Sequence, residues 1–315
     1  MMKELRQIIE RVRECPGQAW ALATLVETRG STYRKPGARM LVDEQGTTLG
    51  VLSGGCLEEE IARHGLELID GAAARVIEFD TRRLYGCDGA VRILVEFIPP
   101  AAERGNLLTE LGHRVDHRGL CRLSSRYEGE ELGTTLLAPD ELVPERNGTF
   151  LHCVPLPVRL LLFGAGPEIS PLLHLAQTLG WLTLQFTHAT DLAEDFTPDA
   201  QTVALVMTHN FGRDLAVLHR LVPFQLPYVG LLGPRRRHQQ LIGELLSLGA
   251  SFADSLASLH APAGLDLGSE SPEEIALSIV SEVAAVLAQR HGGHLRDRAI
   301  PIHLADTAFT KSEAA

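Results

Sequence analysis

The stretch VRLLLFGAGPEISPLLHLAQTLG, Val158 to Gly180, decides the fold class of one half of this 315-residue chain. It opens with a short apolar run that ends at a glycine turn containing Gly164 and Gly166. A helix is expected next, with Pro167 near its start and Gly180 just after its end. An apolar strand, a tight turn and a helix in this order are typical of a doubly wound α/β domain.

The same pattern continues downstream. Three more short apolar segments are each followed by helical or loop sequence: WLTLQF, TVALVMT and PYVGLLG. Alternating strands and helices predict a Rossmann-like parallel sheet covered on both faces. A capping box, with Ser271 as N-cap and Glu274 at the third helical position, predicts a helix start rather than a catalytic acid.

The first hundred residues predict a mixed α/β domain instead. We expect strands in Ala19–Thr28 and in Ala38–Ser53, the second a hairpin, and then a helix in LEEEIARHGLELID. Two more strands, ARVIEFD and AVRILVEFIP, flank the loop TRRLYGCDG. Residues 101–157 are less regular, with candidate strands of a meander, and end in the proline-rich HCVPLPV. We therefore expect an N-terminal domain of residues 1–157 and a C-terminal domain of residues 158–315.

Composition narrows the class of function. The chain is 45% hydrophobic and 22% charged, which is typical of globular proteins. A net charge of -11 and 5% aromatic residues argue against nucleic-acid binding. There is no run of 18 apolar residues, and the start MMKELRQIIERVREC resembles an amphipathic helix, so we expect a cytoplasmic protein without a membrane segment. Five scattered cysteines without a CxxC pair predict reduced thiols and no metal site.

The segment VLSGGCLEEE, residues 51–60, places Cys56 at an expected helix start. The helix dipole and free N–H groups there favour a thiolate. Ser53, Gly54 and Gly55 precede the thiol, and the backbone amides of the two glycines could close on an anion. Three glutamates follow and disfavour a thiolate, although helical geometry sends them to different faces. A structural cysteine is the alternative interpretation.

Two loops of the N-terminal domain add candidate ligand groups. Cys87 stands in YGCDG, flanked by glycines. The loop TRGSTYRKPGARM, residues 28–40, carries four basic and no acidic residues, among them Arg34 and Arg39. Such a loop can hold a phosphate or can simply be solvated. A thiol, a glycine nest and a basic loop together suggest an anionic, thiol-sensitive ligand.

In the C-terminal domain, Gly164 and Gly166 begin a dinucleotide fingerprint. The match is incomplete, because Ile169 occupies the third glycine position and Thr187 stands where a ribose-binding acid is expected. An ordinary strand-to-helix turn is the alternative.

MTHN and GLLGPRRR end two further strands of this domain. Because carboxyl ends of parallel strands share one edge, we expect their polar residues near the glycine turn: His209, Asn210, Arg235 and Arg236. Two arginines at that edge suit a phosphate. The alternative is that the arginines open a solvated helix face.

Several motifs occur together in an informative order. They are TRGSTYRKPGARMLV, GVLSGGCLEEEI, YGCDGAVRILVE, LFGAGPE, VMTHNFGRD, YVGLLGPRRR and PAGLDLGSESPEEIALSIVSEV. This set resembles the XdhC/CoxI family of accessory proteins for molybdenum hydroxylases. The resemblance spans about residues 15–100 and 158–290.

The resemblance implies a cytosolic chaperone for the molybdopterin molybdenum cofactor, either the simple form or its cytosine dinucleotide. Such a protein assists sulfuration of the cofactor and delivers it to a xanthine dehydrogenase-like or carbon monoxide dehydrogenase-like hydroxylase. A cysteine desulfurase is the implied sulfur donor. Cys56 and Cys87 are the implied holders of cofactor or sulfur. We also expect a homodimer.

The chain departs from the family pattern at three places. Asp88 follows Cys87 where a glycine is usual, Pro167 replaces a common histidine, and Thr187 replaces a common acid. The last two changes weaken an NAD(P) role. The alternative functions are an NAD(P)-dependent Rossmann oxidoreductase with His209 as acid/base, and a thiol redox sensor. A chaperone is favoured over a catalyst.

Overall fold

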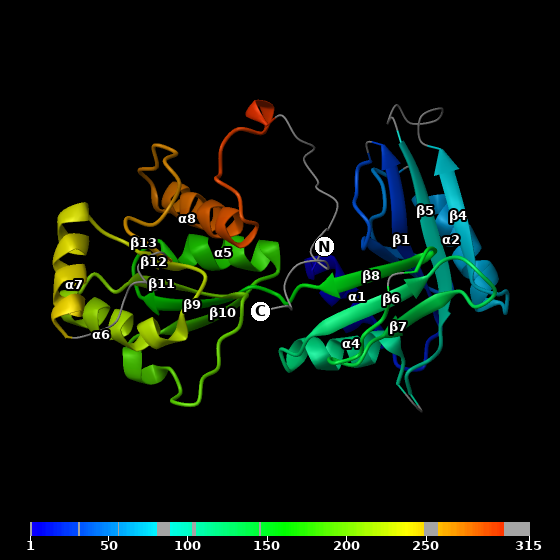
Figure 1. The fold of residues 1–315 in the computed structure, drawn as a ribbon, viewed down its shortest axis with the longest axis horizontal. Helices are drawn as coiled ribbons and strands as arrows, with labels where there is room; N and C mark the ends of the chain where they lie inside the picture. Colours follow the sequence, from blue (N-terminus) through cyan, green and yellow to red (C-terminus); the bar gives the residue numbers. More distant parts are fainter. Residues whose placement is uncertain are drawn as a thin grey trace. The chain divides into compact units, whose positions relative to one another are not determined.

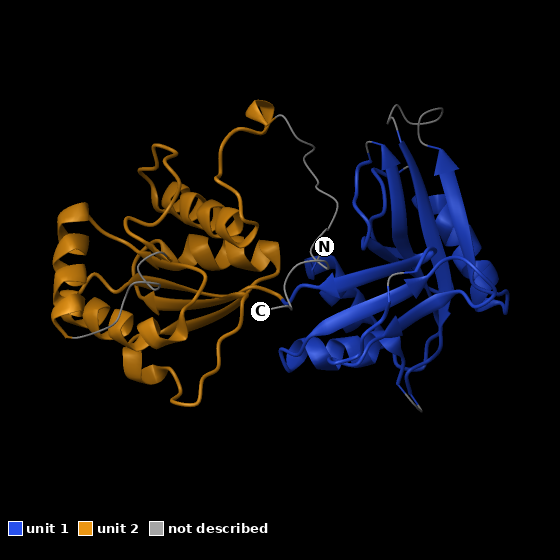
Figure 2. Ribbon diagram, in the orientation of Figure 1, with its two compact units in different colours: residues 1–156 blue, residues 157–315 orange. Residues whose placement is uncertain are grey.

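A computed structural model describes residues 2–30, 32–55, 57–80, 89–102, 105–144, 146–248 and 258–298. The chain divides into two compact units, which we call unit 1 (residues 1–156) and unit 2 (residues 157–315) (Figure 2). Unit 1 is mixed α/β and unit 2 contains a parallel sheet between helices, which confirms the predicted fold class (Figure 1).

The described residues of unit 1 form helices and strands along the whole length of the unit. In chain order they are α1 (Met2–Glu14), β1 (Trp20–Gly30), β2 (Arg39–Val42), β3 (Thr48–Gly50), α2 (Glu58–Ile69), β4 (Arg75–Asp80), β5 (Gly89–Ile98), α4 (Leu107–Asp116), β6 (Cys121–Arg126), β7 (Gly133–Leu136) and β8 (Thr149–Val154). The predicted hairpin, helix and flanking strands of the first hundred residues are confirmed.

The larger sheet of unit 1 is antiparallel, in the order β3-β2-β1-β5-β4. Alternate residues of β1 face opposite sides, as strand geometry requires. Ala21, Ala23 and Leu25 pack toward α2, whereas Trp20 and Leu22 pack toward α1. Both faces of the sheet are therefore covered, which accounts for the continuous apolar run in its central strand.

Helix α1 packs against both sheets of unit 1. Ile8 and Val12 pack on the larger sheet, whereas Leu5 and Ile9 pack against the smaller sheet, whose order is β7-β6-β8. The pairs Leu5–Ile9 and Ile8–Val12 each follow the four-residue spacing that places side chains on one helix face. The smaller sheet contains the strands expected in the less regular segment, but it is not the expected meander, because β8 pairs with β6 and not with β7.

Helix α4 was not predicted from the sequence. The side chain of Asn106 caps it by accepting hydrogen bonds from the N–H groups of Leu108 at 3.1 Å and Thr109 at 3.0 Å. The Thr109 hydroxyl oxygen accepts in return from the N–H of Asn106 at 2.8 Å. This is a capping box with Asn and Thr in place of the usual Ser and Glu.

Unit 2 repeats a strand-helix pattern. Its elements are β9 (Arg159–Gly164), α5 (Ile169–Leu179), β10 (Leu182–Phe186), η1 (Ala189–Asp191), β11 (Thr202–Met207), α6 (Phe211–Leu221), η2 (Val222–Phe224), β12 (Val229–Leu231), α7 (Arg235–Ser247), β13 (Leu259–His260), α8 (Pro272–Leu287) and η3 (Leu295–Asp297). Gly180 ends α5 with a left-handed φ of 76°, and Ser271 and Glu274 form the predicted capping box of α8.

The five strands of unit 2 are parallel, in the order β10-β9-β11-β12-β13. On β9, Leu160 and Leu162 pack toward α5 and α8, whereas Leu161 and Phe163 pack toward α6 and α7. Figure 1 shows these helix pairs on opposite sides of the sheet. This is the doubly wound architecture that the apolar strands predict.

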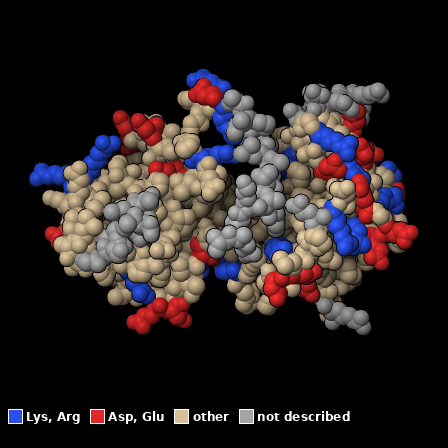
Figure 3. All heavy atoms as spheres, viewed as in Figure 1, with Lys and Arg blue, Asp and Glu red and all other residues tan. Residues whose placement is uncertain are grey.

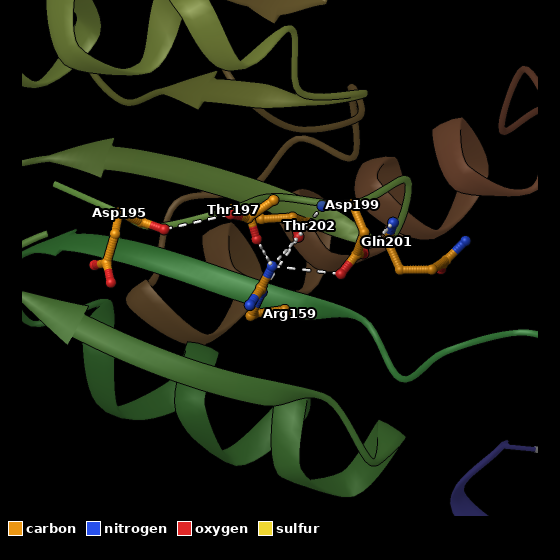
Figure 4. Close-up of polar contacts among 6 residues, drawn as sticks. All are labelled: Arg159, Asp195, Thr197, Asp199, Gln201 and Thr202. Atoms are coloured by element: carbon orange, nitrogen blue, oxygen red, sulfur yellow. Dashed lines mark hydrogen bonds and ion pairs between the residues drawn. The ribbon is translucent and has the colours of Figure 1, made fainter. Parts of the chain in front are cut away.

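A polar cluster ties together the amino ends of β9 and β11 (Figure 4). The Arg159 guanidinium donates to the carbonyl oxygen of Thr197 at 2.8 Å and to the hydroxyl of Thr202 at 3.0 Å. It also lies 3.4 Å from Asp199 and stacks over the ring of Phe196 at 4.5 Å. These contacts stabilise the edge of the sheet opposite the one where ligands bind in this architecture.

Surface charge is mixed on unit 1. On the face of unit 1 seen in Figure 3, basic and acidic side chains lie interspersed. Arg92 illustrates the pattern, since it pairs with Glu27 at 3.0 Å and with Glu128 at 2.6 Å. In the part of the chain that the structure describes, none of the helices has the length and apolar character needed to span a bilayer.

Candidate functional site

The carboxyl ends of β9 and β11 form the topological switch point of unit 2. From β9 the chain continues to β10 on one side and then crosses to β11 on the other. Ligands of doubly wound sheets bind at this position. The last residues of the two strands, Gly164 and Met207, are register partners, so the turn after β9 and the segment after β11 share one edge.

The glycine turn after β9 lies close to Met207, Glu168 and His209. A Cβ at Gly164, whose φ is +152°, would lie 2.4 Å from the carbonyl oxygen of Met207. A Cβ at Gly166 would lie 2.5 Å from Oε2 of Glu168 and 2.8 Å from Nε2 of His209. Only glycine fits at Gly164 without displacing backbone. Gly166 is where the side chains of Glu168 and His209 converge.

His209 is held in an unusual conformation. Its φ of 56° is in the left-handed region, which costs free energy for a residue with a side chain. Its side chain is 52% exposed, and Nε2 lies 3.8 Å from Oε2 of Glu168. In the described chain that carboxylate oxygen is buried and has no hydrogen-bond partner. Sequence reasoning missed Glu168, although an acid in the first turn after Gly-x-Gly is unusual for a phosphate site.

The neighbours of His209 are fixed by a hydrogen-bond network. Asn210 is the N-cap of α6, and its Oδ1 accepts from the N–H of Arg213 at 3.0 Å. The hydroxyl of Thr208 donates to Oδ1 of Asp214 at 2.6 Å. Asn210 thus has a structural role, and the segment that carries His209 is anchored on both sides.

The arginines of α7 divide into an outer pair and an inner one. Arg235 and Arg236 are exposed in the first turn. Arg237 instead forms an ion pair with Asp214 of α6, whose side chain is fully buried. The ion pair joins the beginnings of α6 and α7 at the carboxyl edge. The phosphate contact proposed from the sequence for Arg235 and Arg236 stays a prediction.

A second polar cluster is centred on Glu282 of α8. Oε2 of Glu282 accepts from the Tyr228 hydroxyl at 2.7 Å and from the N–H of Gly264 at 2.7 Å. Nδ1 of His260 lies 3.0 Å from Oε1 of the same carboxylate, and its ring stacks on Tyr228. No sequence pattern indicates this cluster, because its members are far apart along the chain.

In unit 1, the Gly54–Gly55 turn precedes α2 as expected. Gly55 has a φ of +102°, and a Cβ at either glycine would meet no atom within 4 Å among the residues that the structure describes. The two glycines are exposed, whereas Leu52 and Leu57 beside them are buried. The Ser53 side chain hydrogen-bonds to Glu58 at 2.6 Å. An internal carboxylate therefore already occupies the inner side of this turn.

The two arginine candidates of the basic loop have internal partners. Arg34 forms an ion pair with Glu4 of α1, in which Nη1 donates to Oε1 at 3.1 Å. Arg39 is 4% exposed, and its Nη1 donates to the carbonyl oxygen of Gly37 at 2.9 Å. Burial lowers the pKa of Arg39 to about 10, although Glu96 raises it in part. The contacts that the structure shows for both residues are structural.

Arg39 belongs to a buried polar cluster between the two sheets of unit 1. Burial raises the pKa of Glu96, against hydrogen bonds from Thr134 and the charge of Arg39. Nδ1 of His152 lies 3.4 Å from the Arg39 guanidinium. Burial, with Arg39 and Lys35, lowers the pKa of His152 to about 3. The imidazole is therefore neutral at physiological pH.

The two cysteine candidates, Cys56 and Cys87, lie outside the described residues. Their joint location on one surface stays a prediction. Within the described ranges, the structure contains no group of three or more His, Cys, Asp or Glu residues arranged to hold a metal ion.

Fold and site together define a two-unit α/β protein with a Rossmann domain that lacks the complete dinucleotide fingerprint. Residues 16–80 match the XdhC and CoxI family, and residues 160–283 match the XdhC Rossmann domain. The chain belongs to the XdhC and CoxI family.

Two curated relatives align along most of both chains. A Bacillus subtilis (strain 168) protein, named as a probable subunit of xanthine dehydrogenase, is 28% identical over 311 residues, covering 83% of this chain and 91% of the relative. The molybdenum cofactor insertion chaperone PaoD of Escherichia coli (strain K12) is 27% identical over 279 residues, covering 86% and 84%.

A solved structure shares the fold. It is a Bacillus halodurans protein described as a xanthine dehydrogenase, with a TM-score of 0.77 and 24% sequence identity. The superposition covers 91% of this chain and 96% of that protein. The arrangement of strands and helices is therefore common to both proteins.

Proposed function

We propose that this protein binds a molybdopterin-type molybdenum cofactor as cargo, assists its sulfuration and delivers it to a xanthine dehydrogenase-like molybdenum hydroxylase. The observation that carries the proposal is the similarity to PaoD, a molybdenum cofactor insertion chaperone, across 86% of this chain. The similarity includes both units, so it extends beyond the Rossmann domain that many unrelated proteins share.

The Gly54–Gly55 turn is the part of unit 1 that best suits such a cargo. The turn is exposed, and no atom of the described residues lies within 4 Å of a Cβ built at either glycine. A bulky ligand can approach the backbone there. Cys56 follows directly in the chain, and we propose that it and Cys87 hold the cofactor or the sulfur that a cysteine desulfurase supplies. We further propose a cytoplasmic homodimer.

The Rossmann edge is a poor match for NAD(P) chemistry. A dinucleotide pyrophosphate approaches the second glycine of Gly-x-Gly. Here the Glu168 carboxylate lies beside Gly166 and would repel that anion. This weighs against the alternative of an NAD(P)-dependent oxidoreductase. His209 instead offers an exposed imidazole at the switch point, where a neutral or donor group of the cargo could bind.

The direct test is the composition of the purified protein. The protein is produced in a host that makes the cofactor, purified without oxygen, and analysed for molybdenum and for pterin fluorescence after oxidation. We expect both to co-purify with the protein, and we expect transfer to a molybdenum-free hydroxylase to restore its activity. Absence of both, together with saturable NAD(P) binding, would establish the oxidoreductase alternative.

A further inference from the structure

The first residue of α2 turns its side chain back over the preceding loop. Oε1 of Glu58 accepts hydrogen bonds from the N–H groups of Leu52 at 3.0 Å and Ser53 at 2.7 Å. Oε2 accepts from the hydroxyl of Ser53 at 2.6 Å and from the N–H of Leu57 at 3.1 Å. One carboxylate thus receives four donors, and the donors lie on both sides of the Gly54–Gly55 turn.

These contacts anchor the turn on its inner side. Leu52 and Leu57, which carry two of the donors, are 4% and 2% exposed and pack in the core of unit 1. Gly54 and Gly55 between them are exposed. Two glycines in an unanchored loop would sample many conformations, because glycine is the least restricted residue. The carboxylate of Glu58 restricts that freedom.

Simple stabilisation of the helix does not account for this arrangement. Glu59 and Glu60 are also in the first turn of α2, where an acid complements the helix dipole without bending back. Both are exposed, whereas Glu58 is partly buried. Burial raises the pKa of Glu58, but hydrogen bonds from Ser53 and Leu52 outweigh it and hold the pKa below its ordinary value of 4.5. The carboxylate is therefore ionised at neutral pH, as an acceptor of four donors must be.

We infer that Glu58 is a positioning residue: its carboxylate fixes the Gly54–Gly55 turn in the conformation that receives the cargo. The functional half of this inference rests on the proposed function. The structural half does not, since it concerns only the conformation of the turn. Glu58 itself faces the inside of the loop and need not touch the ligand.

The test compares Glu58→Gln with Glu59→Gln in the full-length protein. Both variants remove one negative charge from the same helix turn, but only the first loses an acceptor for the Ser53 hydroxyl or the Leu57 N–H. Hydrogen exchange at the amides of Leu52, Ser53 and Leu57 reports the turn. Molybdenum and pterin content report the cargo. A third variant, Glu58→Asp, keeps the carboxylate on a shorter stem.

We expect Glu58→Gln to lower both the exchange protection of these amides and the cargo content by about tenfold or more. Glu59→Gln should match wild type, and Glu58→Asp should recover part of both losses. Unchanged protection in folded Glu58→Gln would overturn the inference, as would lost protection with normal cargo content. If wild type carries no cargo, the proposed function fails, and the exchange data alone decide whether Glu58 fixes the turn.

Discussion

Asp214 of α6 and Arg237 of α7 form an ion pair at the carboxyl edge of the unit 2 sheet, with the Asp214 side chain fully enclosed. The same carboxylate accepts from the hydroxyl of Thr208 at 2.6 Å and from its N–H at 3.2 Å. One buried acid thus fixes the starts of two helices and the segment that leads to His209.

We expect Asp214→Asn to destabilise unit 2 by about 3 kcal/mol, because it leaves the Arg237 charge without its partner in a largely buried site. Denaturant unfolding measures the change. Arg236→Gln is the matched control, since it removes an exposed arginine of the same helix turn and should stay within about 0.5 kcal/mol of wild type. Equal stability of both variants would show that the ion pair does not hold this edge together.

Tyr228 provides a second test of buried polar contacts. Burial, together with the hydrogen bond to Glu282, raises the pKa of its hydroxyl well above the ordinary value of 10. Tyr228→Phe removes a donor to a carboxylate and should cost about 2 kcal/mol. Tyr33→Phe is the control, because Tyr33 is 66% exposed. Thermal and denaturant unfolding of the two variants should therefore differ, and matching curves would contradict this assignment.

His152 predicts a pH dependence of stability. Its pKa is lowered from 6.5 to about 3 in the folded protein, mainly by burial. Above pH 6.5 the imidazole is neutral in both states and its contribution is fully present. As the pH falls from 6.5 toward 3, only the unfolded state gains the proton, so stability is lost by up to about 1.4 kcal/mol per pH unit.

His152→Gln should remove this component, because glutamine does not titrate. The measurement is the free energy of unfolding of wild type and variant at pH 7, 6 and 5. Wild type should lose stability faster than the variant as the pH falls below 6.5. Parallel curves would mean that the imidazole takes up a proton in the folded state as readily as in the unfolded one.

The hydrophobic pattern of the sequence was sufficient to predict the doubly wound unit. It was not sufficient to predict which polar side chains pair with one another. Arg235, Arg236 and Arg237 are indistinguishable by composition. Which of them faces Asp214 depends on the residue at which α7 begins. The exact start of a helix is difficult to predict from a sequence pattern. The arginine that pairs with Asp214 is the third, and the phosphate contact of Arg235 and Arg236 stays a prediction.

Buried charges are hard to predict for a related reason. The sequence pattern places Arg39 where a basic loop meets an expected strand, and in the structure it begins β2, all four residues of which are buried. A basic residue in such a strand is a cation in the protein interior, and two of its neighbours come from distant parts of the sequence. The Gly37 carbonyl oxygen accepts a hydrogen bond from it, the charge of Glu96 raises its pKa, and Nδ1 of His152 lies 3.4 Å away. Glu58 is comparable, since local pattern shows a helix start but not a side chain that bends back to Ser53.

Cys56 is the sharpest test of the proposed function. Cys56→Ser is nearly isosteric, and we expect the melting temperature to stay close to that of wild type. Serine remains protonated near neutral pH, so it cannot replace a thiolate as a ligand of the metal or as a carrier of sulfur. Bound molybdenum and activation of a client hydroxylase should therefore fall sharply. Cys153→Ser, which alters an exposed cysteine of β8, should change neither.

A structural role for Cys56 predicts the opposite pattern. A buried hydroxyl without a hydrogen-bond partner costs about 1–3 kcal/mol, so Cys56→Ser would then lower the melting temperature. Cargo content per folded molecule would stay normal, because the thiol would not contact the ligand. A destabilised variant with normal molybdenum and pterin content would make Cys56 a core residue and leave the Gly54–Gly55 turn without its proposed reactive group.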